Sequence, residues 1–246
     1  MMLLGKRVLI TGGGTGTGAD MARGFAGAGA EVVVTGRRLE PLKKLALANP
    51  SIRAIAADVT QEDSVRAMFA EAGACDIVIA NAGAAESGLV VKTSLEQWHA
   101  MLAVNLTGAF LTLREGLRQM PGWGRLISIA SVAGLKGYAY AAPYAAAKHG
   151  VIGLTRSLAL EVAKKPITVN AICPGFLDTE MTERSVANII AKTGKTVDEA
   201  RAALCSGNPQ GRLIRPDEVT ATALWLCGPG ADSVNGQAIA LSGGEV

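Results

Sequence analysis

The sequence is poor in the residues that build metal sites. Its 246 residues include four cysteines and two histidines. The cysteines, at positions 75, 173, 205 and 227, lie far apart and form no CxxC pair. Structural zinc sites need closely spaced Cys and His ligands, so no metal site is expected. We interpret the cysteines as buried thiols in a reducing compartment.

Aromatic residues, blocks of like charge and long apolar runs are scarce as well. Aromatics make up 4% of the chain, the formal net charge is +3, and no Lys/Arg run exceeds two residues. Nucleic-acid-binding surfaces concentrate positive charge, so no nucleic-acid partner is expected. No apolar run approaches the roughly 18 residues of a membrane span, and the N-terminus has no signal-peptide cleavage pattern. The expectation is a cytoplasmic protein without a membrane partner.

The chain is rich in apolar residues, at 49%, and in glycine, with 30. Seven short apolar segments alternate with longer segments of helical pattern; the short ones are 7–11, 31–36, 52–58, 76–83, 125–131, 167–173 and 237–243. Each is apolar on both faces, as strands of a helix-covered parallel sheet are. The pattern predicts an α/β fold: a doubly wound, mostly parallel seven-stranded Rossmann-type sheet with helices on both faces, in one domain over 1–246.

One connection is longer and more polar than the others. Residues 176–215 join two predicted strands and read as a helical insertion. Ligands of open α/β sheets bind beyond the carboxyl ends of the strands, where this insertion would lie. We interpret it as a substrate lid; the alternative is a packing or subunit-contact element.

A glycine-rich segment, TGGGTGTG at 11–18, follows the first predicted strand and opens a helix. Glycines allow positive φ and close approach of a ligand, and helix N-termini favour phosphate. The segment has two possible registers: TGxxxGxG through Gly12, Gly16 and Gly18, or GxGxxA through Gly14, Gly16 and Ala19. In a βαβ unit either register predicts a dinucleotide site, with a purely structural turn as the alternative.

The end of the second predicted strand bears on the choice of dinucleotide. Domains that prefer NAD usually carry Asp or Glu there, whereas this chain has Gly36, Arg37 and Arg38. Two guanidinium groups are suited to a 2′-phosphate, so NADP(H) is favoured over NAD(H). The alternative is that both arginines are only solvated charges.

The stretch YAAAK at 144–148 places a phenol and an ammonium group one helical turn apart. A nearby ammonium favours the phenolate, so we expect Lys148 to lower the pKa of Tyr144 and make it a proton donor and acceptor. Tyr138 and Tyr140 have no lysine four residues later. A half-buried tyrosine beside a surface lysine is the structural alternative.

Four motifs occur in order: TGGGTGTG, NAG at 81–83, Ser131 at a strand end, and YAAAK. Together they resemble the short-chain dehydrogenase/reductase family, over essentially the whole chain. The resemblance implies a catalytic set in which Tyr144 is the general acid or base and Ser131 polarises the substrate oxygen. Lys148 would hold the nicotinamide ribose, and Asn105 would anchor a water in a proton relay.

The resemblance also implies the cofactor contacts. These would come from Gly12, Gly14, Thr15, Gly16, Thr17, Gly18, Arg37, Arg38, Asp58, Val59, Asn81, Ala82, Gly83, Tyr144, Lys148, Pro174, Gly175, Leu177 and Thr179. The pocket for the substrate would be lined by Ala84, Ala85, Glu86, Ala133, Gly134, Phe176 and Leu177. A homotetramer is implied, with the C-terminal LSGGEV at a subunit contact.

The run from 141 to 183 resembles 3-oxoacyl reductases, polyketide ketoreductases and 3-hydroxyacyl dehydrogenases, which implies a carbonyl or secondary alcohol of 3-oxoacyl or 3-hydroxyacyl type. A thioester of coenzyme A or acyl carrier protein would bring phosphates, for which Arg184, Lys192, Lys195 and Arg212 are candidates. Ordinary surface charge would explain these four residues equally well. The sequence leaves a sugar, cyclic alcohol or steroid substrate open, and also a non-catalytic dinucleotide-binding sensor or scaffold.

Overall fold

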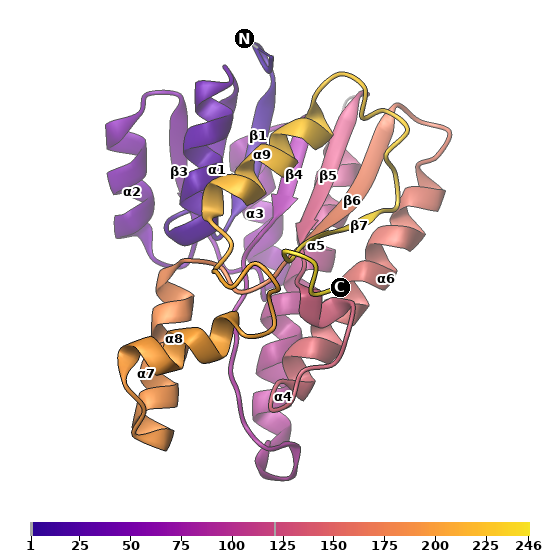
Figure 1. Ribbon diagram of the computed structural model, residues 1–246. Coiled ribbons are helices and arrows are strands. Elements are labelled where there is room, and N and C mark those ends of the chain that lie inside the picture. Colours follow the sequence, from indigo (N-terminus) through magenta and orange to yellow (C-terminus); the bar gives the residue numbers. More distant parts are fainter. Residues whose placement is uncertain (1, 121) are drawn as a thin grey trace.

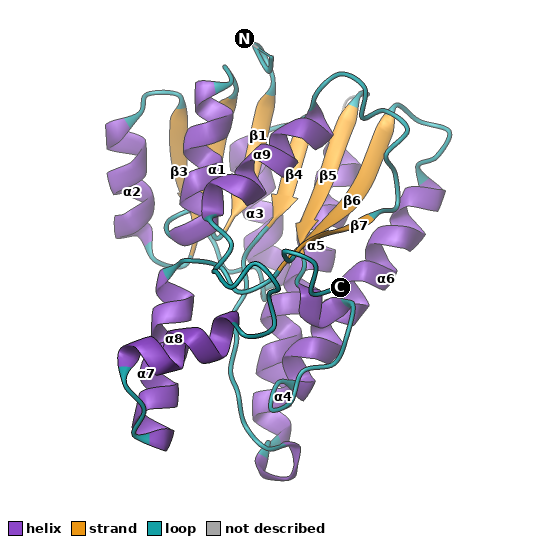
Figure 2. Cartoon of the chain, viewed as in Figure 1, coloured by secondary structure: helices purple, strands orange, loops and turns teal. Residues whose placement is uncertain are grey.

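The computed structural model describes residues 2–120 and 122–246 and contains a seven-stranded parallel sheet between two layers of helices (Figures 1 and 2). The strand order is β3-β2-β1-β4-β5-β6-β7. The strands are β1 (Arg7–Thr11), β2 (Glu31–Gly36), β3 (Ile52–Ala56), β4 (Ile77–Ala80), β5 (Gly124–Ile129), β6 (Ile167–Pro174) and β7 (Ala238–Leu241). The predicted fold class is confirmed, and every ladder in the sheet is parallel.

Both faces of the sheet are buried under helices. Side chains alternate along each strand, so successive residues enter different cores. Val8 and Ile10 of β1 face one core and Leu9 faces the other. The first core is covered by α1 (Gly16–Gly27), α2 (Leu39–Ala48) and α9 (Pro216–Cys227). The second is covered by α3 (Glu62–Ala72), α5 (Gly108–Gln119) and α6 (Ala142–Glu161). This explains why the strand segments are apolar throughout.

The strand order reverses between β1 and β4. Ile10 of β1 pairs with both Val34 of β2 and Ile79 of β4. The strands β2 and β3 are added on one side of β1, and β4 to β7 are added on the other. Connections that diverge at such a point leave a crevice at the carboxyl ends of the strands. Strand β4 ends at Ala80, earlier than predicted, so that the NAG motif at 81–83 leaves the sheet and lies at this crevice.

The insertion at 176–215 is helical, as predicted, with α7 (Glu180–Thr193) and α8 (Val197–Cys205). The Ile214 amide donates to the Phe176 carbonyl at 2.8 Å, and the Asp178 amide donates to the Ile214 carbonyl at 2.9 Å. The insertion therefore leaves and returns at one point. In Figure 1 it projects beyond the carboxyl ends of the strands, on the same side as α4 (Leu95–Leu102).

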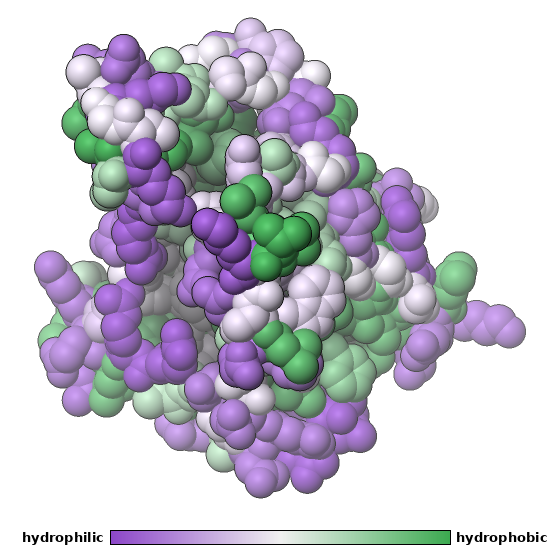
Figure 3. All heavy atoms as spheres, turned by 90° about the horizontal axis from the view of Figure 1, so that it is seen from below, coloured by the Kyte–Doolittle hydropathy of each residue, from purple (hydrophilic) through white to green (hydrophobic). Residues whose placement is uncertain are grey.

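Viewed from that side, the molecule shows hydrophobic side chains gathered near the middle of the face, between hydrophilic ones (Figure 3). This is the face on which the loops after the strands meet the insertion. Within the described residues, no helix is both long and apolar enough to cross a membrane.

Candidate active site

The loop after β1 packs so closely against the rest of the protein that two of its glycine positions admit no side chain. Gly12 and Gly16 have φ of +65° and +52°, where glycine is favoured. A β-carbon on Gly12 would lie 2.9 Å from the Ala82 Cα, and one on Gly18 would overlap the Gly12 carbonyl oxygen. The structure therefore supports the TGxxxGxG register, because these three glycines are the ones the backbone requires.

The start of α1 suits an anion. Its N-cap, Thr15, makes no capping hydrogen bond through its side chain, and the first turn has no acidic residue. The N-terminal amides of a helix attract negative charge when no side chain satisfies them. The chain's own residues thus fit the pyrophosphate of a dinucleotide at this loop.

The NAG motif ties the loop to β4. The Asn81 side-chain amide donates to the carbonyl oxygens of Thr11, at 2.9 Å, and Gly12, at 3.2 Å. The Thr11 hydroxyl accepts from the Asn81 and Ala82 amides at 3.0 and 3.1 Å. These bonds fix the glycine loop and the first residues after β4 against each other.

Two cavities flank this region. One of about 370 Å³ is lined by Arg37, Thr60, Ala84 and Val104, together with residues of α4. Partial burial works against ionisation of Asp58 beside it. Hydrogen bonds from Thr60 and the charge of Arg37 outweigh that effect and lower the pKa of this carboxyl. Asp58 is therefore an oriented, charged acceptor at the end of β3.

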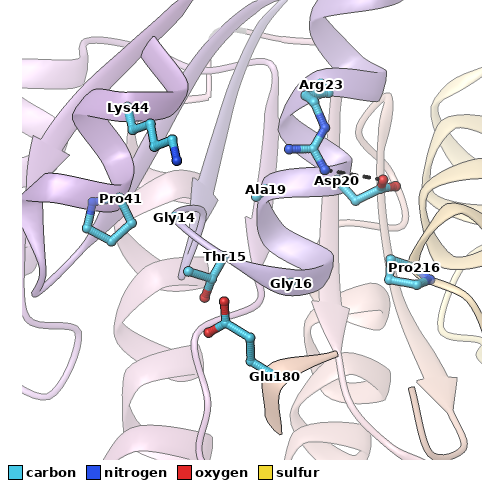
Figure 4. Close-up of a pocket in the computed structure, with 10 residues that line it drawn as sticks. All are labelled: Gly14, Thr15, Gly16, Ala19, Asp20, Arg23, Pro41, Lys44, Glu180 and Pro216. Carbon is cyan, nitrogen blue, oxygen red and sulfur yellow. Dashed lines mark ion pairs between the residues drawn. The ribbon is translucent and has the colours of Figure 1, made fainter. Parts of the chain in front are cut away.

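The second cavity, of about 470 Å³, lies beside the glycine loop (Figure 4). Lys44 of α2 reaches toward Gly14, while Glu180 of α7 points at Thr15 from the opposite side. Arg23 lines the same cavity and pairs with Asp20 at 3.5 Å. Sequence reasoning missed Lys44, because the pattern of α2 does not show which of its two adjacent lysines faces the loop.

The structure brings Tyr144, Lys148 and Ser131 together at the carboxyl end of β5. Tyr144 and Lys148 lie one turn apart near the start of α6, with the Lys148 nitrogen 5.6 Å from the centre of the tyrosine ring. Lys148 is buried and donates to the Ile129 carbonyl at 2.9 Å. Ser131 lies close enough to Tyr144 to lower the pKa of its phenol. A phenol, a hydroxyl and a buried amine thus meet at one point.

Asn105 reaches the same point from a different element. It lies in a π-helical turn, Ala103–Thr107, between α4 and α5, and is buried. Its amide donates to the carbonyls of Ala84 at 2.9 Å and Met101 at 3.1 Å. A β-carbon on Gly83 would lie 2.8 Å from the Asn105 oxygen and 3.8 Å from the Lys148 nitrogen. The four expected residues therefore converge on the NAG motif.

A family model described as short chain dehydrogenase matches residues 6–189, which include this whole constellation. The chain belongs to the short-chain dehydrogenase/reductase family. It is therefore an oxidoreductase that uses a nicotinamide dinucleotide.

Relatives of this short-chain dehydrogenase/reductase match it along its full length. It is 36% identical to a D-beta-hydroxybutyrate dehydrogenase of Cupriavidus necator, over 100% of this chain and 99% of that one. It is 35% identical to a 3-oxoacyl-[acyl-carrier-protein] reductase of Aquifex aeolicus, over 98% of both chains. Among solved structures, an actinorhodin polyketide ketoreductase variant with NADPH superposes with a TM-score of 0.91 at 33% identity, over 98% of this chain and 97% of that one.

The electrostatics of the phenol differ from the expectation. Burial raises the pKa of Tyr144 and the nearby Cys173 thiol adds to this, while Ser131 lowers it in part. Burial also lowers the pKa of Lys148, to about 8. The expectation that Lys148 lowers the pKa of Tyr144 is wrong for the protein by itself, because burial raises this pKa and Lys148 is not among the groups that lower it.

A contact between three side chains beside the site is not predicted by the sequence, which places the C-terminal LSGGEV at a subunit contact and gives Tyr138 no role. Lys136 and Tyr138 lie between Ser131 and Tyr144, and both contact Glu245, the penultimate residue. Glu245 is 5% exposed. No sequence pattern links residue 245 to this loop, since the link depends on where β7 ends in the fold.

Of the basic residues proposed to meet thioester phosphates, Arg212 is already engaged. Its guanidinium donates to both Glu218 carboxylate oxygens, at 2.7 and 2.8 Å. Such a bidentate pair occupies the guanidinium edge that a phosphate would use. Arg184, Lys192 and Lys195 are exposed on the insertion and remain candidates.

Proposed function

We propose that this enzyme uses NADP(H) to interconvert the carbonyl and secondary-alcohol forms of 3-oxoacyl and 3-hydroxyacyl groups. The observation that carries the proposal is the convergence of Tyr144, Ser131 and Lys148 near a glycine loop whose uncapped helix start borders a cavity, as a dinucleotide requires. A protein that only binds the dinucleotide has no use for a phenol and a hydroxyl aimed at one point.

Each residue of the set has a role that its surroundings support. The bound nicotinamide supplies or accepts the hydride. Tyr144, whose raised pKa keeps it protonated at neutral pH, donates its proton to the substrate oxygen in reduction and takes it back in oxidation. Ser131 donates to the same oxygen, so that charge developing there meets two hydroxyl donors. Lys148, buried behind the phenol, is placed to hold the ribose.

Asn105 is a positioning residue in this scheme. Both hydrogens of its amide are donated within the protein, to Ala84 and Met101, and its oxygen accepts from the Ala84 amide at 3.3 Å. One lone pair of the oxygen is left for a water, as the family resemblance implies. The main effect of the side chain is to hold Gly83 and Ala84 against the π-helical turn.

The preference for NADP(H) rests on the cations around the adenosine end. Arg37 and Arg38 directly follow β2, with no carboxylate at the strand end itself; Arg37 also lies near Asp58, and Lys44 lines the cavity next to the glycine loop. A 2′-phosphate carries negative charge that these groups would pair with, whereas the ribose hydroxyl of NAD(H) would leave them unpaired.

The substrate class draws on the relatives. One is named for a free hydroxy acid and another for an acyl group on a carrier protein, and both names place the reacting oxygen at the third carbon. The insertion at 176–215 would act as a lid, since the Asn188 amide of α7 donates to the Ser87 hydroxyl after β4 at 3.3 Å, across the face that holds the site. We further propose a homotetramer, which light scattering would test; a monomer at micromolar concentration would contradict it.

The test is a pair of tyrosine variants. The enzyme is mixed with NADPH or NADH and a neutral acetoacetyl ester, and cofactor oxidation is followed by absorbance. Tyr144→Phe is expected to lose turnover by about 100-fold or more while keeping its affinity for NADPH. The matched control, Tyr140→Phe, changes an exposed tyrosine and is expected to keep both. Tight binding of NADPH without turnover in wild-type enzyme would favour the non-catalytic binder.

A further inference from the structure

The last residues of the chain place a buried carboxylate against the segment that joins Ser131 to Tyr144. Glu245 accepts from the Tyr138 hydroxyl and from the Lys136 ammonium group at 3.0 Å. Its side chain is 5% exposed. A buried carboxylate is costly unless it is paired, so these two donors explain how the charge is tolerated there.

Three segments around the catalytic phenol meet at this carboxylate. Lys136 and Tyr138 belong to the segment between Ser131 and Tyr144. The ring of Tyr138 packs edge-on against Phe176, with 6.3 Å between ring centres. A β-carbon on Gly175 would lie 3.7 Å from one carboxylate oxygen of Glu245.

The insertion also touches this group. A β-carbon on Gly207, which follows α8, would lie 2.7 Å from the other Glu245 oxygen. In Figure 1 the C-terminus lies beyond the carboxyl ends of β6 and β7, close to the segment that leads into α6. The Glu245 carboxylate therefore lies where the segment between Ser131 and Tyr144, Gly175 and the residues after α8 come together.

Outside the insertion, the charges on the segments that border the site leave no cation free for an anionic substrate. From Ser131 to Lys148 the chain carries two basic residues: Lys136, which is paired with Glu245, and Lys148, whose nitrogen is bound to the Ile129 carbonyl. The other bordering segments, 81–88 and 173–179, carry one acid each, Glu86 and Asp178, and no base. A substrate carboxylate would therefore find no unpaired cation on these segments, and burial of an unpaired charge opposes binding.

We propose that Glu245, held by Tyr138 and Lys136, is a specificity determinant that makes the enzyme accept neutral 3-oxoacyl esters and thioesters and discriminate against free 3-oxo and 3-hydroxy acids. This inference rests on the proposed function and narrows its substrate class. Lys136 and Tyr138 act as positioning residues that keep the carboxylate at the pocket.

The experiment compares two substrates with the same reacting ketone. With NADPH saturating, kcat/KM is measured for ethyl acetoacetate and for acetoacetate, in wild-type enzyme, in Glu245→Gln, and in Glu71→Gln, which removes an exposed acid on α3. Wild type and Glu71→Gln are expected to favour the ester by about tenfold or more. In Glu245→Gln the value for acetoacetate is expected to rise about tenfold, mainly through KM, with the ester value little changed.

The outcomes distinguish a failure of the proposed role of Glu245 from a failure of the proposed function. Wild-type enzyme that uses acetoacetate as well as the ester overturns the role of Glu245 while the proposed function stands, and this comparison needs no variant to fold. An unchanged ratio in Glu245→Gln, in protein that binds NADPH and melts like wild type, overturns it as well. If neither compound is turned over, the proposed function itself fails.

Discussion

The nitrogen of Lys148 lies 5.6 Å from the centre of the Tyr144 ring and donates at 2.9 Å to the carbonyl of Ile129, at the end of the neighbouring strand. The ammonium group is thus held between the phenol and the sheet, out of water. Burial lowers its pKa to about 8. The ammonium group of Lys148 is thus buried without a carboxylate partner, among the residues that the structure describes, to stabilise its charge. Such strongly shifted pKa values cluster at functional sites.

The burial of the Lys148 ammonium group is expected to change the free energy of unfolding of Lys148→Met relative to wild type. The pKa of the lysine falls from 10.5 to about 8 on folding, so at pH 7 the folded chain holds a proton at a cost of about 3 kcal/mol. Between pH 8 and 10.5 the unfolded chain binds more protons at this residue, so the contribution of Lys148 to wild-type stability rises with pH. The variant is expected to be the more stable at pH 7, with an advantage that shrinks toward pH 10.5.

Urea unfolding at pH 7, 8, 9 and 10 measures this difference directly. Lys164→Met, at an exposed lysine after α6, serves as the control and should track wild type across the range. A difference between wild type and Lys148→Met that does not vary with pH would show that the lysine is not desolvated as described.

A second pair of variants tests the glycine cradle. A β-carbon on Gly18 would overlap the Gly12 carbonyl oxygen, whereas one on Gly27, at the other end of α1, meets nothing within 4 Å. Gly18→Ala is expected to cost about 2 kcal/mol or more of stability and to weaken dinucleotide binding, because the loop must shift. Gly27→Ala is expected to be neutral or stabilising by about 0.5–1 kcal/mol. Thermal melts and NADPH titration of both proteins give the comparison; similar behaviour of the two would contradict the geometry.

Much of this fold follows from local pattern. The seven strand segments are visible because each is apolar on both faces, as Val8, Leu9 and Ile10 show on entering opposite cores. The glycines could be placed because positive φ and close approach leave few other choices at Gly12 and Gly16. Tyr144 and Lys148 could be paired because a helix brings residues four apart together.

Some features depend on the assembled fold and have no local signal. The π-helical turn that orients Asn105 cannot be predicted from the sequence AVNLT, because the same residues are compatible with an α-helix. The position of Glu245 depends on the path of β7 and on the loop after α8. The raised pKa of Tyr144 is not predictable from the YAAAK spacing, because spacing reveals the neighbouring lysine but not the burial of the phenol.

The cofactor preference makes a prediction for Arg37. Its charge already lowers the pKa of Asp58, so it lies beside the carboxylate that we expect to meet the adenosine. Arg37→Ala is expected to weaken NADPH binding about 10- to 100-fold, as loss of a charge-assisted hydrogen bond does, and to leave NADH binding nearly unchanged. Fluorescence titration with each cofactor measures both affinities without turnover. Arg66→Ala on α3 is the charge-matched control, and an equal loss for both cofactors would argue against 2′-phosphate recognition.

Glu218 stabilises the end of the insertion, at Arg212 and Arg215, and this stabilisation is expected to weaken at acid pH. The Glu218 carboxylate is held by Arg212 and by the Arg215 amide, at 2.8 Å, and these bonds lower its pKa from 4.5 to about 2. A carboxyl whose pKa is lowered by folding contributes stability above its unfolded pKa and loses it as the pH falls. The stability difference between wild type and Glu218→Gln is therefore expected to be constant above pH 5 and to shrink between pH 4.5 and 2.

Urea unfolding at pH 7, 5, 4 and 3 gives the profile, with Glu71→Gln as the exposed control. Because Ile214 and Arg215 stand where the insertion rejoins the sheet, Glu218→Gln should also speed proteolysis within 176–215 at neutral pH, before global unfolding. If cleavage in that segment is unchanged while overall stability falls, Glu218 stabilises α9 alone and does not fasten the lid.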